Sequence, residues 1–160
     1  IDTAKTSAMV FIILFGASAF TGIFMSLDGD QLIATWIASV GIGKWGAFAI
    51  MMAIVFVMGM FLDWLGIVMI VFPIFLPIMD MFGFDRLWIV AVTAVMLQTC
   101  FMTPPFGFAL FYIKGIVPPE VKIQEIYKGV IPFILIIIAV VVLVTVFPQI
   151  VYFLPNLVAS

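Results

Sequence analysis

"QTCFMTPPFGFALF", residues 98–111, decides the fold, because it places two adjacent prolines inside an apolar run typical of a membrane helix. Neither Pro104 nor Pro105 has a backbone N–H, and one interior proline destabilises a helix by about 3 kcal/mol or more. Inside a bilayer no water is present to pair with the carbonyl groups that are left free. A break at this place therefore needs a function or support from neighbouring protein.

Composition indicates that the chain is surrounded by lipid. Of its 160 residues, 67% are hydrophobic and 9% are charged, and the mean hydropathy is +1.44. Soluble domains carry about 25% charged residues. The formal charge of −2 and the lack of a basic stripe exclude a nucleic-acid partner. The sequence has no histidine, the commonest metal ligand, and its single cysteine, Cys100, allows no internal disulfide.

Apolar length divides the chain into five parts, because a spanning helix needs about 20 apolar residues. We predict an all-α polytopic (multi-pass) membrane protein. Its parts are a transmembrane helix with an interfacial arm (1–45), a re-entrant helical hairpin (46–79), a discontinuous transmembrane helix (80–113), a cytoplasmic loop (114–128) and a C-terminal transmembrane helix with a tail (129–160). The chain begins without methionine, so we expect it to be part of a longer polypeptide.

The hairpin is predicted from "GMFLDWLG", residues 59–66, at the centre of an apolar segment too long for one span and too short for two. Asp63 is the carboxylate at this centre, and a lone aspartate at mid-depth is costly on a lipid-facing helix. Pro73 and Pro77 lie four residues apart in the second limb, where a helix needs support from neighbouring protein. The alternative is one long, tilted span with a kink.

Oxygen ligands gather at the two breaks. In secondary transporters, unwound helices expose carbonyls to small cations, and half-helix N-termini favour anions. Oxygen-only ligands suit an alkali cation better than a transition metal. Glycines at the breaks, Gly66 among them, let backbones approach. We predict a site for sodium and substrate formed by Gly59, Asp63, Thr99, Phe101, Met102, Thr103, Pro104, Pro105 and Gly107, with sodium bound by Gly59, Asp63, Thr103 and nearby backbone carbonyls.

Each of these features also has a purely structural interpretation. Asp63 can cap the second hairpin helix, Thr99 can bond to its own helix, and the prolines can kink a packed helix. A membrane-embedded enzyme is disfavoured, because one deep aspartate and no histidine cannot form a protease site, so we expect no enzyme and no cofactor. The remaining alternative is a non-transporting membrane anchor or channel subunit of a larger complex.

Three stretches in order carry a family resemblance: "GMFLDWLGIVMIVFPIFLPI", "FGFDRLW" and "LQTCFMTPPFGFALFYIKGIVPPEV". They resemble the large membrane (permease) subunit of tripartite ATP-independent periplasmic (TRAP) transporters, in its C-terminal part, over residues 46–147. The resemblance implies half of an inverted-repeat, elevator-type transporter in a bacterial or archaeal inner (cytoplasmic) membrane. It places Gly59 and Asp63 at the hairpin tip, and Thr103, Pro104, Pro105 and Gly107 at the unwound helix.

The resemblance also implies sodium-coupled import of organic acids (carboxylates), with Na+ as the coupling ion. The implied partners are the N-terminal half of the same large subunit, a small membrane subunit, a periplasmic solute-binding protein and the lipid bilayer. The ending "FALFYIKGIVPPEV" resembles the subgroup associated with 2-oxo acids.

Basic residues indicate an orientation for the chain. If the hairpin enters from the periplasm, the cytoplasmic segments carry four lysines and the periplasmic segments carry one lysine and one arginine. These are Lys5, Lys114, Lys122 and Lys128 on the first side, and Lys44 and Arg86 on the second. The excess agrees with the rule that cytoplasmic loops are richer in basic residues.

Overall fold

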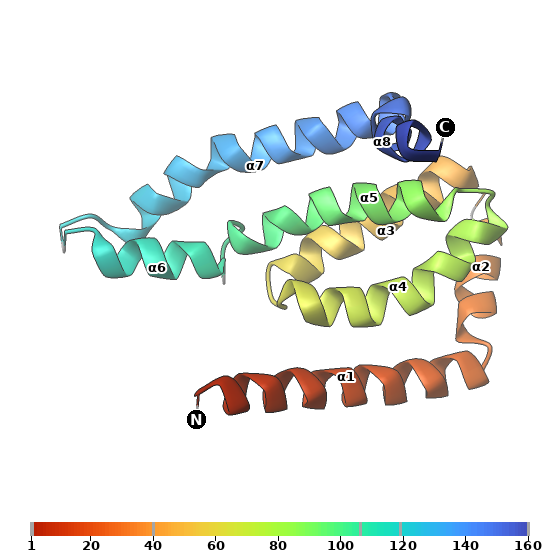
Figure 1. Cartoon of the computed structure of the whole chain (residues 1–160), viewed down its shortest axis with the longest axis horizontal. Coiled ribbons are helices and arrows are strands. Elements are labelled where there is room, and N and C mark those ends of the chain that lie inside the picture. The colour runs from red at the N-terminus through yellow and green to blue at the C-terminus, as the bar shows by residue number, and fades with distance from the viewer. Residues whose placement is uncertain (1, 40, 106, 119, 160) are drawn as a thin grey trace.

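The chain folds into helices that lie side by side, with shorter helices across their ends (Figure 1). The computed structural model describes residues 2–39, 41–105, 107–118 and 120–159. The elements are α1 (Asp2–Ser26), α2 (Gly29–Ser39), α3 (Gly43–Gly59), α4 (Trp64–Met81), α5 (Arg86–Leu97), the 3₁₀ helix η1 (Gln98–Phe101), α6 (Phe108–Ile116), α7 (Ile123–Val146) and α8 (Gln149–Ala159). The described residues are thus those of an all-helical protein.

Helices α3 and α4 form an antiparallel hairpin (Figure 1). The first limb ends where the N–H of Leu62 bonds to the carbonyl of Met58 at 2.8 Å, and the second begins where Ile67 bonds to Asp63 at 3.1 Å. The alternative of a single kinked span is therefore wrong. Entry and exit of the hairpin on one membrane side stays a prediction.

The turn between α4 and α5 follows from local sequence signals. Gly83 adopts a φ of 74°, which glycine reaches without steric cost, and the N–H of Phe84 bonds back to the carbonyl of Met79 at 3.0 Å. Asp85 then caps α5, because its carboxylate accepts a 3.0 Å hydrogen bond from the backbone N–H of Trp88. These two signals fix the second limb of the hairpin beside α5.

The core lies where α2, α3, α4 and α5 meet. Its fully buried side chains are almost all apolar and include Ile37, Met51, Val55, Ile67, Val71, Ile78, Met79, Ile89 and Val92. Trp45, Phe48, Phe84 and Trp88 pack at the base of the hairpin, with ring centroids 5.1 to 6.2 Å apart. The indole N–H of Trp88 also donates to the carbonyl of Val144 at 3.3 Å, so α7 is joined to the same unit.

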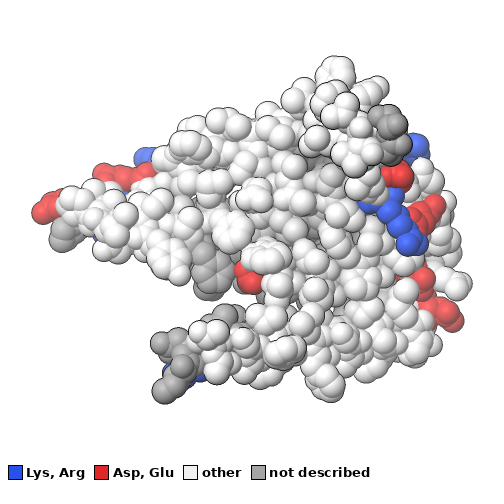
Figure 2. Space-filling model, in the orientation of Figure 1, with Lys and Arg blue, Asp and Glu red and all other residues white. Residues whose placement is uncertain are grey.

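The visible face is largely apolar between two charged ends, with one acidic side chain near its middle, as Figure 2 shows. Among the described residues, three helices are long and apolar enough to cross a membrane: Thr3–Ser26, Trp64–Met81 and Ile123–Val146. Helix α1 exposes Phe11 (69%) and Phe15 (79%), as a lipid-facing helix does. The N-terminus and the turn between α6 and α7 lie at one end, and the turns on either side of α2 and between α4 and α5 at the other (Figure 1).

The structure is more helical than the sequence predicted around the loop at 114–128. Helix α6 continues to Ile116 and α7 already begins at Ile123. The side chain of Glu125 accepts a 3.1 Å hydrogen bond from the N–H of Lys122, which satisfies a free donor at the start of α7. The non-helical stretch is therefore shorter than the predicted loop.

Candidate functional site

The two breaks predicted from the sequence meet in space. Gly59, the last residue of α3, lies against Cys100 in η1, and a Cβ built at Gly59 would be 2.5 Å from the Cys100 sulfur. That distance is far below van der Waals contact, so a larger residue at this position would require the Cys100 side chain to shift. The hairpin tip and the interrupted helix thus share one location, although they are about 40 positions apart in the sequence.

The prolines leave two backbone carbonyls of the broken helix without their helical donors. In a continuous helix the carbonyls of Cys100 and Phe101 would accept from the N–H groups of residues 104 and 105. Pro104 and Pro105, joined by a cis peptide bond, have no N–H. Among the described residues no backbone hydrogen bond outside the helices replaces these two.

The two threonines of the break are buried and bond to their own helix. The hydroxyl of Thr99 donates to the carbonyl of Met96, and that of Thr103 to the carbonyl of Thr99, each at 2.7 Å. The structural interpretation of Thr99 is thus confirmed. Because a hydroxyl oxygen keeps acceptor capacity after donating its proton, Thr103 can still offer an oxygen to a cation.

Asp63 occupies the N-cap position of α4, with ψ at 150°, but its side chain makes no cap hydrogen bond. The carboxylate is half-buried at the tip of the hairpin. Its position at the cap was predicted correctly, whereas a hydrogen-bonded cap is wrong. Among the described residues no cluster of three His, Cys, Asp or Glu side chains could hold a metal ion.

Gly107 and Gly66, the other glycines at the breaks, differ in their surroundings. Gly107 lies against backbone, since a Cβ there would be 3.0 Å from the Phe101 oxygen and from the Met102 carbonyl carbon. Gly66, in contrast, has no atom of another described segment within 4 Å of such a Cβ. Pro105 is exposed, and its carbonyl lies 3.5 Å from the hydroxyl of Tyr127 in α7.

Sequence reasoning did not identify Cys100 or Gln98 as site residues. The contact between Cys100 and Gly59 joins distant parts of the chain and leaves no local signal. Gln98 is exposed at the start of η1 and lines a groove of about 480 Å³ between α4 and α5, together with Trp64 and Phe101. A lone amide within an apolar run was the signal that could have identified it.

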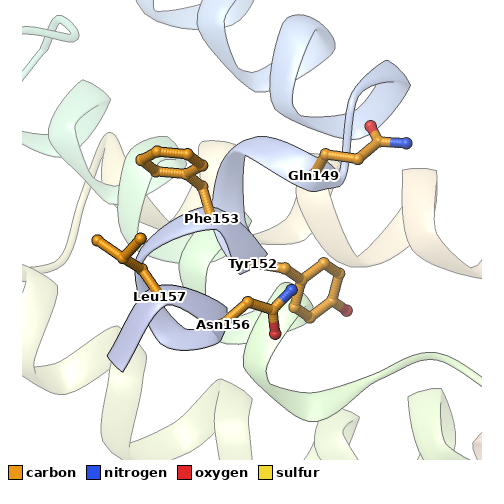
Figure 3. A pocket seen from close by; sticks show the side chains of 5 residues that line it. All are labelled: Gln149, Tyr152, Phe153, Asn156 and Leu157. Atoms are coloured by element: carbon orange, nitrogen blue, oxygen red, sulfur yellow. The ribbon is translucent and has the colours of Figure 1, made fainter. Parts of the chain in front are cut away.

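A second hollow lies on α8, far along the chain from the breaks. It measures about 500 Å³ and is lined by Gln149, Tyr152, Phe153, Asn156 and Leu157, all from this one helix (Figure 3). It contains none of the predicted site residues. The candidate site is therefore the junction of the hairpin tip with the broken helix.

Comparison with known proteins places these features in a family. The tripartite ATP-independent periplasmic transporter, DctM component, matches residues 1–150. A sialic acid TRAP transporter permease of Haemophilus influenzae is 34% identical over 66% of this chain, which corresponds to 17% of that protein.

Two further relatives match almost the whole chain. The C4-dicarboxylate TRAP transporter large permease of Pseudomonas aeruginosa is 24% identical over 98% of the chain and 36% of its own length. The ectoine/5-hydroxyectoine TRAP transporter large permease of Ruegeria pomeroyi is 30% identical over 99% of the chain and 38% of its own length. The chain thus spans little more than a third of these two relatives. With a family match that extends from α1 into α8, the chain belongs to the DctM component family of TRAP transporters.

Proposed function

We propose that the chain forms the C-terminal part of a sodium-coupled secondary transporter that imports organic acids. The observation that carries the proposal is the junction of Gly59 with Cys100, beside carbonyls that the prolines leave without donors. Secondary transporters place their ion and substrate sites at such interrupted helices. Two of the relatives named above are, by name, permeases for sialic acid and C4-dicarboxylate, which supports an organic acid as substrate.

Sodium is the coupling ion in this proposal because the ligands available at the junction are hard oxygen donors. Asp63 supplies negative charge, Thr103 a hydroxyl oxygen, and residues near Gly59 and in the break supply carbonyls. No nitrogen ligand from histidine is available, since the sequence has none. Alkali cations prefer this ligand set, whereas transition metals prefer nitrogen and sulfur.

The transporter works, in this proposal, as an assembly. The relatives are much longer than this chain, so the matching half of the large subunit would complete the site and move with this half as an elevator. A small membrane subunit and a periplasmic solute-binding protein, which would deliver the acid, complete the tripartite system in the inner membrane.

The test is uptake by the full-length large subunit with both partners in proteoliposomes. Labelled organic acids, including a C4-dicarboxylate and a 2-oxo acid, are offered under an inward sodium gradient and under a matched potassium gradient. Uptake of at least one acid with sodium and not with potassium supports the proposal. Equal uptake in both gradients would contradict sodium coupling. Binding of an acid without its uptake would favour the alternative of a non-transporting membrane anchor.

A further inference from the structure

A small pocket lies at the base of the hairpin, at the end of the molecule that also carries the turn between α4 and α5, where acidic and basic side chains gather (Figure 2). It measures about 230 Å³ and forms where the start of α3, the turn between α4 and α5, and the segment joining α7 to α8 come together. The hollow on α8, in contrast, is lined by one helix. Side chains that line the pocket include Lys44, Trp45, Phe84, Asp85, Trp88 and Tyr152.

The pocket presents one positive and one negative group to a ligand. The ammonium of Lys44 lies 5.6 Å from the ring centroid of Trp45 and 5.1 Å from that of Phe84, and it forms no ion pair with another described residue. The carboxylate of Asp85 accepts a 3.0 Å hydrogen bond from the backbone N–H of Trp88. Because an ionised carboxylate has about four acceptor sites, capacity remains for a further donor.

The side chains around the pocket are those of a boundary between bilayer and water. Tryptophan and lysine are enriched at that level, where the ring or the aliphatic stem contacts apolar groups and the polar end reaches water. Trp45 is 53% exposed, although its ring packs against those of Phe48 and Trp88, which are buried. Helix α8, which supplies Tyr152, also exposes apolar side chains that acyl chains can contact: Ile150, Phe153 and Leu154.

The two opposite charges limit the class of ligand. A lone anion would be attracted by Lys44 and repelled by Asp85, and a lone cation would meet the reverse. An acyl chain would leave both charges without a partner. A zwitterion with a phosphate and a primary ammonium satisfies both groups. A quaternary ammonium suits the pocket less well, because it has no N–H for the carboxylate and because Lys44 already lies over the rings of Trp45 and Phe84.

We propose that this pocket binds the headgroup of a zwitterionic phospholipid with a primary amine, of the phosphatidylethanolamine type. The phosphate contacts Lys44, the ammonium contacts Asp85, and the acyl chains lie along apolar helix surfaces. The pocket is smaller than the roughly 300 Å³ or more of sites for drug-sized ligands, which suits a headgroup of few atoms. Since Lys44 lies in the first turn of α3 and Asp85 caps α5, a bound headgroup joins the starts of these helices. The proposal holds whichever ion or substrate the protein transports.

Lipid binding to the full-length large subunit with its small subunit tests the headgroup. The complex is purified in detergent and stripped of lipid, and native mass spectrometry measures its affinity for dioleoyl lipids with ethanolamine, choline or glycerol headgroups. We expect the ethanolamine lipid to bind about tenfold more tightly than the other two, because only its ammonium donates a charge-assisted hydrogen bond to a carboxylate. Equal affinities, or tightest binding of the anionic glycerol lipid, would overturn the proposal.

Two variants assign this preference to the pocket. Asp85→Asn keeps a favoured cap for α5 and should remove the preference for ethanolamine. Lys44→Gln should weaken binding of all three lipids, since each has a phosphate. The control is Arg86→Gln, which removes a positive charge from an exposed ion pair with Asp80 outside the pocket and should change neither property. The melting temperature without lipid should stay within about 2 °C in all three variants. Natural lipid affinities in both pocket variants would overturn the proposal.

Soluble O-phosphoethanolamine distinguishes a membrane lipid from a soluble molecule with the same charged groups. It has no acyl chains to contact the exposed apolar side chains of α8. At a concentration equal to that of the ethanolamine lipid it should therefore displace none of the bound lipid. Displacement at equal concentration would show that the pocket takes a soluble zwitterion, and it would overturn the assignment to lipid.

Discussion

Gly59 is the residue at which the hairpin and the broken helix touch, and its contact makes a sharp prediction. In Gly59→Ala the new Cβ would lie 2.5 Å from the Cys100 sulfur. Overpacking of this kind costs about 1–3 kcal/mol, more than the 0.5–1 kcal/mol that alanine gains in helix propensity. We expect a lower free energy of unfolding for this variant, measured by thermal or denaturant unfolding in detergent.

Two further variants separate this contact from other effects. Cys100→Ala removes the sulfur and leaves the Cys100 Cβ, at 3.4 Å, as the nearest atom, so the double variant should recover most of the loss. Gly66→Ala, where no atom lies within 4 Å, should be neutral or stabilising by about 0.5–1 kcal/mol. If Gly59→Ala costs the same with and without Cys100, the contact does not determine this position.

A variant of Asp63 distinguishes a role in ion binding from a role as the cap of α4. Its side chain makes no cap hydrogen bond, and asparagine is equally favoured at this position. Asp63→Asn should therefore change the free energy of unfolding by less than about 0.5 kcal/mol. Losing the negative charge should raise the sodium concentration for half-maximal uptake about tenfold, equivalent to about 1.4 kcal/mol of binding. A normal half-saturation with normal folding would show that Asp63 has no part in sodium binding.

At the scale of the helix, we expect the two prolines to keep the break open. Replacing Pro104 and Pro105 with alanine restores N–H donors for the carbonyls of Cys100 and Phe101, each bond contributing about 0.5–1.5 kcal/mol. The double variant should be at least as stable as the natural protein, and its sodium-induced thermal shift should be much smaller. The measurement is the melting temperature of the full-length protein with sodium and with potassium.

The control for this variant is Pro73→Ala, which restores a donor inside α4 and leaves the break unchanged. It should preserve the sodium-induced shift. If the double variant folds and also keeps an unchanged shift, the prolines produce a packing kink and the free carbonyls do not bind sodium. A double variant that loses expression and thermal stability together would contradict the expected closure of the helix.

The helices were predictable from the sequence to the extent that their signals are local. Gly83 and Asp85 mark the turn between the hairpin and α5, and the adjacent prolines mark the break. The start of α7 was missed because it lies in a polar stretch, where the backbone N–H of Lys122 donates a hydrogen bond to the side chain of Glu125. The meeting of Gly59 with Cys100 was not predictable, since it depends on how α3 packs against η1. Periodicity and turn chemistry carry no information about such long-range contacts.

At the scale of the whole molecule, the charged ends define an orientation in the membrane (Figure 2). Lys5, Lys114, Lys122 and Lys128 belong to one end, and Lys44 and Arg86 to the other. By the positive-inside rule we expect the first end to be cytoplasmic. A membrane-impermeant maleimide should label Gln31→Cys from outside intact spheroplasts, and Glu120→Cys only after permeabilisation. The reverse pattern would invert the topology, so that the hairpin would enter the membrane from the cytoplasm.

Residues 1–160 alone should not transport. The chain covers only 36% and 38% of the lengths of two large permease relatives, so most of such a subunit lies outside residues 1–160. Substrate in such transporters lies between the two halves, so half a site offers an acid no enclosed path. Reconstituted alone, the chain should give no sodium-driven uptake of any organic acid, whereas the full-length subunit with its partners should. Co-reconstitution with the separately expressed remainder of the polypeptide distinguishes a missing half from a misfolded fragment, because recovered uptake requires that this chain was folded. Uptake by residues 1–160 at the full-length rate would show that one hairpin and one broken helix suffice.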